Sequence, residues 1–149
     1  MFKRGHIAVY IVAFLLLVLL SLEAWTYYLG TTDVTFERLV GNKPYSEIKE
    51  MSLRRYKEGA ISPHLFTIRT DNDQKVIEKL SQTCRLEKIT VEKLPKVAYE
   101  TDEEMVEVIK KSPYIYLSSS YDLGKPKEGR MCILFRDADN LYLFMNGNL

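Results

Sequence analysis

Few residues of this chain belong to the types that catalysis or metal binding most often uses. The sequence contains two histidines, His6 and His64, and two cysteines, Cys84 and Cys132. His6 lies before a long apolar run, so one histidine and two distant cysteines remain for the rest of the chain. Such a set cannot supply a conventional zinc site. We therefore expect no metal and no cofactor, and we interpret His64, which opens a predicted strand, as a structural residue.

Serines and carboxylates are the other candidates for chemistry. Ser118–Ser120 is a serine run, but it lacks the G-x-S-x-G turn that exposes a nucleophilic serine. Asp102–Glu104 and Glu107 gather at the start of a predicted helix, where negative charge favourably meets the helix dipole without any catalytic role. An envelope enzyme that acts on cell-wall material through Asp and Glu carboxylates is the alternative function that remains open.

The two cysteines allow a disulfide. Cys84 would end the apolar face of a predicted helix and Cys132 lies in a predicted strand, so both side chains could point inward. An even number of cysteines permits a bridge in an oxidising compartment. Two buried thiols that pack as small apolar side chains are the other interpretation. The sequence gives no distance between the two residues and leaves both interpretations open.

A group of aromatic and basic residues is the best candidate for a binding surface. Tyrosine and arginine are enriched at the centres of protein–protein contacts. The group brackets a predicted strand and the loop after it, and we expect it to bind a protein partner; its members are Tyr114, Tyr116, Tyr121, Lys125, Lys127 and Arg130. The competing interpretation is that the tyrosines are half-buried residues of a sheet.

The N-terminal part of the chain is built to enter a membrane. No charged residue lies between Ile7 and Leu22. Extended to residue 29, the segment would be about 35 Å long as a helix, enough to cross a hydrocarbon core of about 30 Å. Aromatic residues prefer the headgroup level of a membrane, and three of them lie near the end of this segment: Trp25, Tyr27 and Tyr28.

The charges that flank this segment predict its orientation. Lys3 and Arg4 precede the apolar run, and the first charge after it is Glu23. The positive-inside rule then places the N-terminus in the cytoplasm and the rest of the chain outside it. We expect residues 1–30 to form a basic flank and an uncleaved signal anchor, and residues 31–149 to form one extracytoplasmic domain. Secretion after cleavage of a signal peptide is the alternative.

The charge balance argues against nucleic acid as a partner. Of the 21 basic and 20 acidic residues, two basic and one acidic residue precede position 31, so the remainder is formally neutral. A phosphate-binding surface needs an excess or a cluster of basic residues.

The order of the predicted elements indicates an α+β domain with a mainly antiparallel sheet and two or three helices packed on one side of it. We expect residues 31–42 to be a connector with a short strand at 34–36. Helices are predicted at residues 45–58, 71–84 (capped by Asp71) and 101–112 (capped by Thr101). Strands are predicted at residues 64–70, 89–91, 114–117, 130–136 and 141–145. The last two strands are apolar on both faces, which is typical of a central or covered position.

The last two predicted strands also resemble the terminal hairpin of small, anchored bacterial envelope proteins. The resemblance rests on Arg130–Asp137 followed by Leu141–Phe144, about a quarter of the outer domain. Some proteins of that kind are immunity factors against delivered toxins. The resemblance therefore implies a non-catalytic immunity or envelope accessory protein, and it transfers no site residue. Together these observations predict a membrane-anchored, extracytoplasmic protein-interaction module without catalysis.

Overall fold

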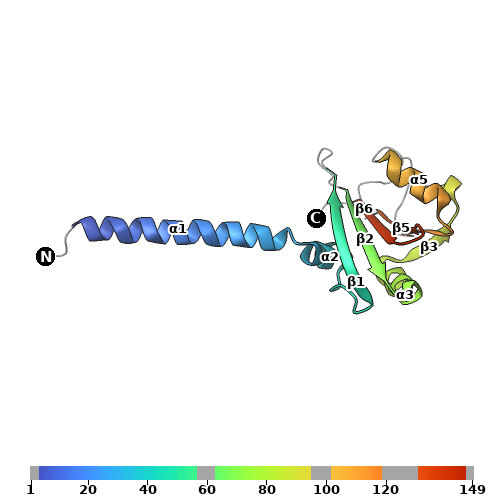
Figure 1. The fold of residues 1–149 in the computed structure, drawn as a ribbon, viewed down its shortest axis with the longest axis horizontal. Coiled ribbons are helices and arrows are strands. Elements are labelled where there is room, and N and C mark those ends of the chain that lie inside the picture. The colour runs from blue at the N-terminus through green and yellow to red at the C-terminus, as the bar shows by residue number, and fades with distance from the viewer. Residues whose placement is uncertain (1–3, 57–62, 95–101, 119–130, 147–149) are drawn as a thin grey trace.

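The computed structural model describes residues 4–56, 63–94, 102–118 and 131–146. It has an α+β fold, in which an apolar N-terminal helix precedes an open, six-stranded antiparallel sheet (Figure 1). The elements in chain order are α1 (Arg4–Leu29), α2 (Thr32–Val40), β1 (Ile48–Arg55), β2 (His64–Thr70), α3 (Asp73–Cys84), β3 (Leu86–Ile89), the 3-10 turn Val91–Lys93, α5 (Glu103–Lys111), β4 (Ile115–Ser118), β5 (Met131–Arg136) and β6 (Leu141–Asn146).

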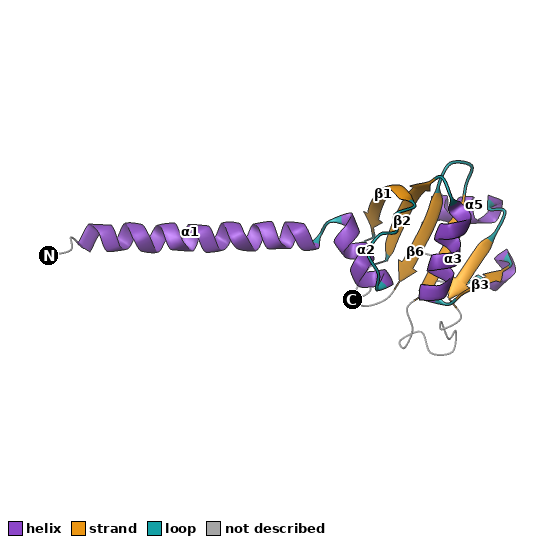
Figure 2. Ribbon diagram, turned by 90° about the horizontal axis from the view of Figure 1, so that it is seen from below, coloured by secondary structure: helices purple, strands orange, loops and turns teal. Residues whose placement is uncertain are grey.

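The sheet has the strand order β1-β2-β6-β5-β4-β3. Its strands lie across the direction of α1, with β1 nearest to that helix and β3 on the far side (Figures 1 and 2). Since neighbouring strands are about 4.8 Å apart, five spacings place β3 about 24 Å beyond β1. The edge strand β1 therefore faces the end of α1, and the other strands follow at increasing distance from it.

Helices cover both faces of the sheet, each over its own apolar cluster. On one face, α2 and α3 pack on residues that include Phe36, Val76 and Leu134. On the other face, α5 packs through Met105 and Ile109 on a second cluster. The expectation that all helices lie on one side is therefore wrong, and the reason is that β5 and β6 are apolar on both faces and need cover on each.

The two last strands form the hairpin that the sequence predicts. Met131–Arg136 pairs with Leu141–Asn146 around a turn at residues 137–140. Both strands lie inside the sheet, and alternate residues such as Ile133 and Leu134 are buried on opposite faces. The predicted central or covered position of this hairpin is confirmed, and so is the predicted strand β2.

Two elements differ in type from the prediction. The segment predicted as a helix at 45–58 contains the edge strand β1, and the predicted short strand at 34–36 belongs to helix α2. In α2 the buried residues Phe36, Leu39 and Val40 follow helical spacing and join the core, although Val34 and Thr35 favour a strand locally. Packing of this stripe outweighs the local preference.

Smaller differences concern the ends of elements. Asn72, and not Asp71, caps α3 by accepting a hydrogen bond from the backbone of Lys75. Asp102, and not Thr101, caps α5. The strand predicted at 89–91 is shifted, because β3 ends at Ile89 and a 3-10 turn follows. In each cap, the side chain that reaches the exposed backbone N–H groups decides where the helix starts.

Helix α1 has the length and composition of a membrane-spanning helix. Its segment Val9–Leu29 comprises 21 residues with a mean hydropathy of 2.2 and is not buried by the rest of the protein. A signal sequence has the same properties, so the helix is compatible with either an anchor or a signal.

Candidate functional site

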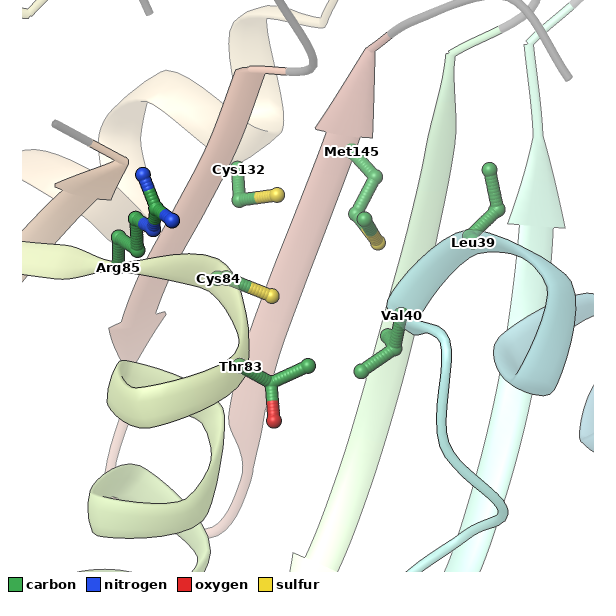
Figure 3. A pocket seen from close by; sticks show the side chains of 7 residues that line it. All are labelled: Leu39, Val40, Thr83, Cys84, Arg85, Cys132 and Met145. Atoms are coloured by element: carbon green, nitrogen blue, oxygen red, sulfur yellow. The ribbon is translucent and has the colours of Figure 1, made fainter. Parts of the chain in front are cut away.

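A pocket of about 210 Å³ lies between α2 and α3 on one face of the sheet. Figure 3 shows its lining, to which α2 contributes Leu39 and Val40. The C-terminal end of α3 and the residue after it contribute Thr83, Cys84 and Arg85, and the strands β5 and β6 contribute Cys132 and Met145. Three sulfur-bearing side chains therefore line one small cavity.

The two cysteines reach this pocket from different elements. Cys84 is the last residue of α3 and is half-buried, whereas Cys132 lies in β5 and is 3% exposed. The backbone N–H of Cys132 donates a hydrogen bond to Ser118 Oγ at 3.1 Å, which fixes the position of Cys132 against β4. The structure brings together the two residues for which the sequence allowed a disulfide, and it contains them as thiols.

Met145 is one of five pocket residues that sequence reasoning missed; the others are Leu39, Val40, Thr83 and Arg85. Met145 lies directly opposite Cys132 in the pairing of β5 with β6, so its side chain shares the face on which Cys132 lies. The alternation of Leu141, Leu143 and Met145 along the last strand was the available signal, but the pairing register was needed to place Met145 beside Cys132.

The described part of the proposed binding surface is half-buried. Tyr114 and Tyr116 pack against the core cluster beneath α3, and their rings meet edge to face with centroids 5.6 Å apart. Burial raises the pKa of the Tyr114 hydroxyl, and the nearby Asp73 carboxylate adds to the effect. The other members of the group, Tyr121, Lys125, Lys127 and Arg130, lie outside the described residues.

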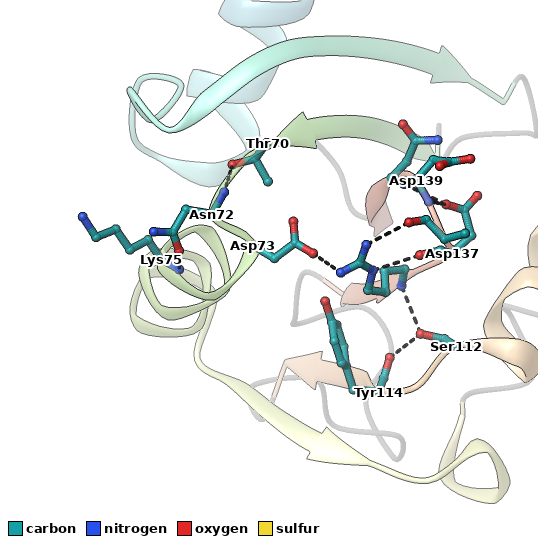
Figure 4. A network of polar contacts seen from close by, with 11 residues as sticks. Thr70, Asn72, Asp73, Lys75, Ser112, Tyr114, Asp137 and Asp139 are labelled. Atoms are coloured by element: carbon teal, nitrogen blue, oxygen red, sulfur yellow. Dashed lines mark hydrogen bonds and ion pairs between the residues drawn. The ribbon is translucent and has the colours of Figure 1, made fainter.

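Arg136 connects the hairpin turn to α3 (Figure 4). Its guanidinium forms an ion pair with Asp73 and donates hydrogen bonds to the carbonyl oxygens of Asp137 at 2.8 Å and Ala138 at 3.1 Å. Its backbone N–H donates to Ser112 Oγ at 3.0 Å. The pair is half-buried, and its contacts hold the turn, so the network is structural.

The carboxylate of Asp102 caps the start of α5. It accepts hydrogen bonds from the backbone N–H groups of Glu104 at 2.9 Å and Met105 at 3.3 Å, and from the Tyr56 hydroxyl at 2.7 Å. Burial opposes its ionisation, but these hydrogen bonds and the charge of Arg54 outweigh burial and lower the pKa of Asp102. Conversely, burial and the bond to Asp102 raise the pKa of Tyr56.

Glu107, considered above for chemistry, and Asp137 also have structural contacts. Glu107 pairs with Lys110 on the exposed face of α5. Asp137 accepts from the backbone N–H groups of Asp139 and Asn140 and from the Tyr142 hydroxyl, each within 2.8 Å. Within the described ranges, no three His, Cys, Asp or Glu residues group as metal ligands. Asp102 and Asp137 therefore stabilise the start of a helix and a turn.

His64 opens β2 and is buried, 4% exposed, opposite Met145 on one side and Arg55 on the other. Its place inside the sheet is consistent with the structural role that we expect for it.

A second hollow lies where the end of α1 meets the domain. The aromatic residues Trp25, Tyr27 and Tyr28 are exposed on the last turns of α1. A hollow of about 520 Å³ lies beside them, lined by Thr26, Tyr27, Gly30, Thr31, Thr32 and Arg55. Aromatic side chains at the end of an apolar helix are typical of a membrane–water interface.

Comparison of the chain with protein-family models, with curated proteins and with solved structures found no match.

Proposed function

We propose that this chain is a membrane-anchored protein-interaction module without catalysis. In this proposal α1 is an uncleaved anchor with its N-terminus in the cytoplasm, and residues 31–149 bind a protein partner on the outer side. An immunity protein or an envelope accessory subunit would act in this way. The observation that carries the proposal is the short, hydrogen-bonded connection between α1 and α2.

That connection supports a domain held at a fixed height above the membrane. Only Gly30 and Thr31 separate α1 from α2, a span of about 7 Å at most. The N–H of Gly30 donates to the carbonyl oxygens of Thr26 and Tyr27, and the N–H of Thr31 donates to that of Tyr28. Since α2 is packed into the core through Phe36, the domain has no flexible stalk. Such a joint would hold a partner-binding domain in a fixed orientation relative to the membrane. A tethered enzyme that must search for soluble substrates gains little from it.

The position of the proposed binding residues fits this arrangement. Tyr116 lies in β4, and Tyr114 is the residue before that strand. In the sheet, only β3 lies farther from β1 than β4 does. A partner that bound there would approach the half of the sheet that lies farther from the anchor, on the face that α3 covers. The neutral charge balance of residues 31–149 further supports a protein over a polyanion as the partner.

Site-specific photo-crosslinking in intact cells tests this proposal. A photoreactive phenylalanine analogue would replace Tyr116 or Tyr121, and a control chain would carry it at Arg38, which is exposed on α2 near the anchor. We expect positions 116 and 121 to capture one and the same protein, and position 38 not to capture it. The purified pair should then lose at least about tenfold in affinity with Arg130→Ala or Tyr116→Ala, the usual effect of truncating a central contact.

Equal capture at all three positions, or no discrete product at 116 and 121 in membranes that contain the folded chain, would contradict the proposed binding surface.

A further inference from the structure

We propose that Cys84 and Cys132 are an oxidisable pair that forms an intramolecular disulfide across the pocket between α2 and α3. The two residues are about 50 positions apart in the sequence, yet both side chains line the same small cavity (Figure 3). The pocket has a volume of about 210 Å³.

The backbone around both cysteines is fixed by the sheet. Ser118 accepts a hydrogen bond from the backbone of Cys132, and the same Ser118 pairs with Leu86 in strand β3. Leu86 follows Cys84 by two residues, after Arg85 has turned the chain with φ of 51°. The end of α3 is thereby tied, through β3 and β4, to the strand that carries Cys132. Two strand spacings, about 10 Å, separate Leu86 in β3 from Cys132 in β5. Disulfide geometry requires Cα atoms within about 7 Å, so the bridge requires the end of α3, where Cys84 lies, to approach β5.

Different exposure of the two thiols sets the order of the reaction. Cys84 is half-buried, whereas Cys132 is buried and only 3% exposed. The Cys84 thiolate attacks one sulfur of a disulfide-bearing oxidant. A mixed disulfide forms on Cys84, and the other half of the oxidant leaves as a thiolate. The Cys132 thiolate then attacks Sγ of Cys84 and displaces the second thiolate. One S–S bond is formed in the protein and the S–S bond of the oxidant is broken. The two halves of the oxidant take up the two electrons and the two thiol protons and become two thiols.

Oxidised glutathione is the probe that tests this pair in the full chain, purified under reducing conditions in detergent micelles. We expect wild type to lose both thiols together, to lower its mass by two hydrogens, to keep no glutathione and to remain a single chain on a non-reducing gel. The melting temperature should rise by about 10 °C on oxidation and return on reduction, as expected for a closed loop of this length.

Single variants separate the two roles. In Cys132→Ser, the remaining Cys84 should hold one glutathione, since no second thiol resolves the mixed disulfide. In Cys84→Ser, the buried Cys132 should stay unmodified for as long as the chain is folded. Met145→Leu is the matched control, because it keeps an apolar side chain of similar volume in the pocket and should bridge as wild type does.

Retention of both thiols in folded wild type, a stable glutathione adduct on wild-type Cys84, or chain-to-chain dimers would each overturn the proposal, and none of these readouts requires a variant to fold. Loss of bridging in Met145→Leu would also count against it. The chemistry in micelles does not rest on the proposed location of the domain. Trapping of thiols in intact cells would show separately whether the compartment oxidises the pair.

Discussion

The guanidinium of Arg55 donates a hydrogen bond to the carbonyl oxygen of Gly30, so the last residue of β1 is bonded to the first residue after α1. The same guanidinium donates to Thr35 Oγ1 on α2 at 3.1 Å. Carbonyl oxygens at the end of a helix carry partial negative charge and lack partners within the helix, so a cation is the favourable side chain there. Arg55 therefore links the anchor helix, the joint and the sheet.

Replacement of Arg55 should loosen this joint and leave the sheet folded. Arg55→Ala removes both hydrogen bonds, and we expect amide exchange of residues 30–36 to accelerate by about tenfold, with a loss of about 1 kcal/mol in the free energy of unfolding, because the side chain is largely exposed. Arg38→Ala, on the exposed face of α2, is the control and should leave exchange unchanged. Equal exchange in both variants would show that α2 holds the joint without Arg55.

Acid should weaken the domain through Asp102 and Asp137. The hydrogen bonds that both carboxylates accept lower their pKa values in the folded state against the opposing effect of burial. A lowered folded-state pKa means that the stabilisation is fully present above the unfolded-state pKa of about 4 and is lost as the pH falls through the folded-state pKa. Urea midpoints measured from pH 7 to pH 2 should therefore decline below about pH 4.

The variant Asp137→Asn tests the origin of that decline. It keeps the shape of the side chain and removes its charge, so it should cost about 1 kcal/mol at pH 7 and should make the urea midpoint less dependent on pH below about pH 4. An acid profile parallel to that of wild type would remove Asp137 as a source.

Arg136 and Lys110 should differ in their contributions to stability, although each forms an ion pair. Arg136 and Asp73 are 28% and 25% exposed and belong to a network that holds the hairpin turn, whereas Lys110 and Glu107 are 50% and 59% exposed. We expect Arg136→Ala to lower the free energy of unfolding by about 2 kcal/mol and Lys110→Ala to change it by less than about 0.5 kcal/mol. Chemical denaturation of both variants measures the difference, and similar losses would contradict the role assigned to the Arg136 network.

Phe36 should be the residue of α2 that matters most for folding. It is fully buried, and its ring meets those of Phe66 and Tyr45 edge to face with centroids 5.4 and 6.0 Å away. Phe36→Ala removes this packing and should cost about 3–5 kcal/mol. The neighbouring, less buried Val34→Ala should cost less than about 1 kcal/mol in the same denaturation experiment. A small effect of Phe36→Ala would mean that α2 does not belong to the core.

The strand β1 shows why part of the fold could not be predicted from the sequence. Its register shifts between Ile48 and Glu50, so an extra residue, Lys49, separates two inward positions. Ile48 and Met51 therefore both pack on the core although they are three residues apart, which is a helical spacing. The regular alternation begins only at Met51 and continues to Leu53, too short a run to reveal an edge strand rich in residues that favour helices.

The apolar elements were predictable because the pattern of apolar residues in their sequences indicates which positions are buried. Strands β2, β5 and β6 have strong apolar patterns, and the sequence predicts them almost to the residue. For the pocket, the inward direction of Cys84 and Cys132 was a valid prediction from each element alone. The neighbourhood of Met145 was not, because it depends on strand register and on the helix pair above it, which no local pattern specifies.

Topology is the measurement that tests the central claim most directly. Alkaline phosphatase, which is active only outside the cytoplasm, and a fluorescent protein that matures only inside it would each be fused after Leu149, and cells would be fractionated. The account predicts phosphatase activity that sediments with the membranes at the full length of the fusion, and no fluorescence. Fluorescence with an inactive phosphatase would contradict the orientation. Active phosphatase released in soluble form and shortened by the length of α1 would contradict the anchor.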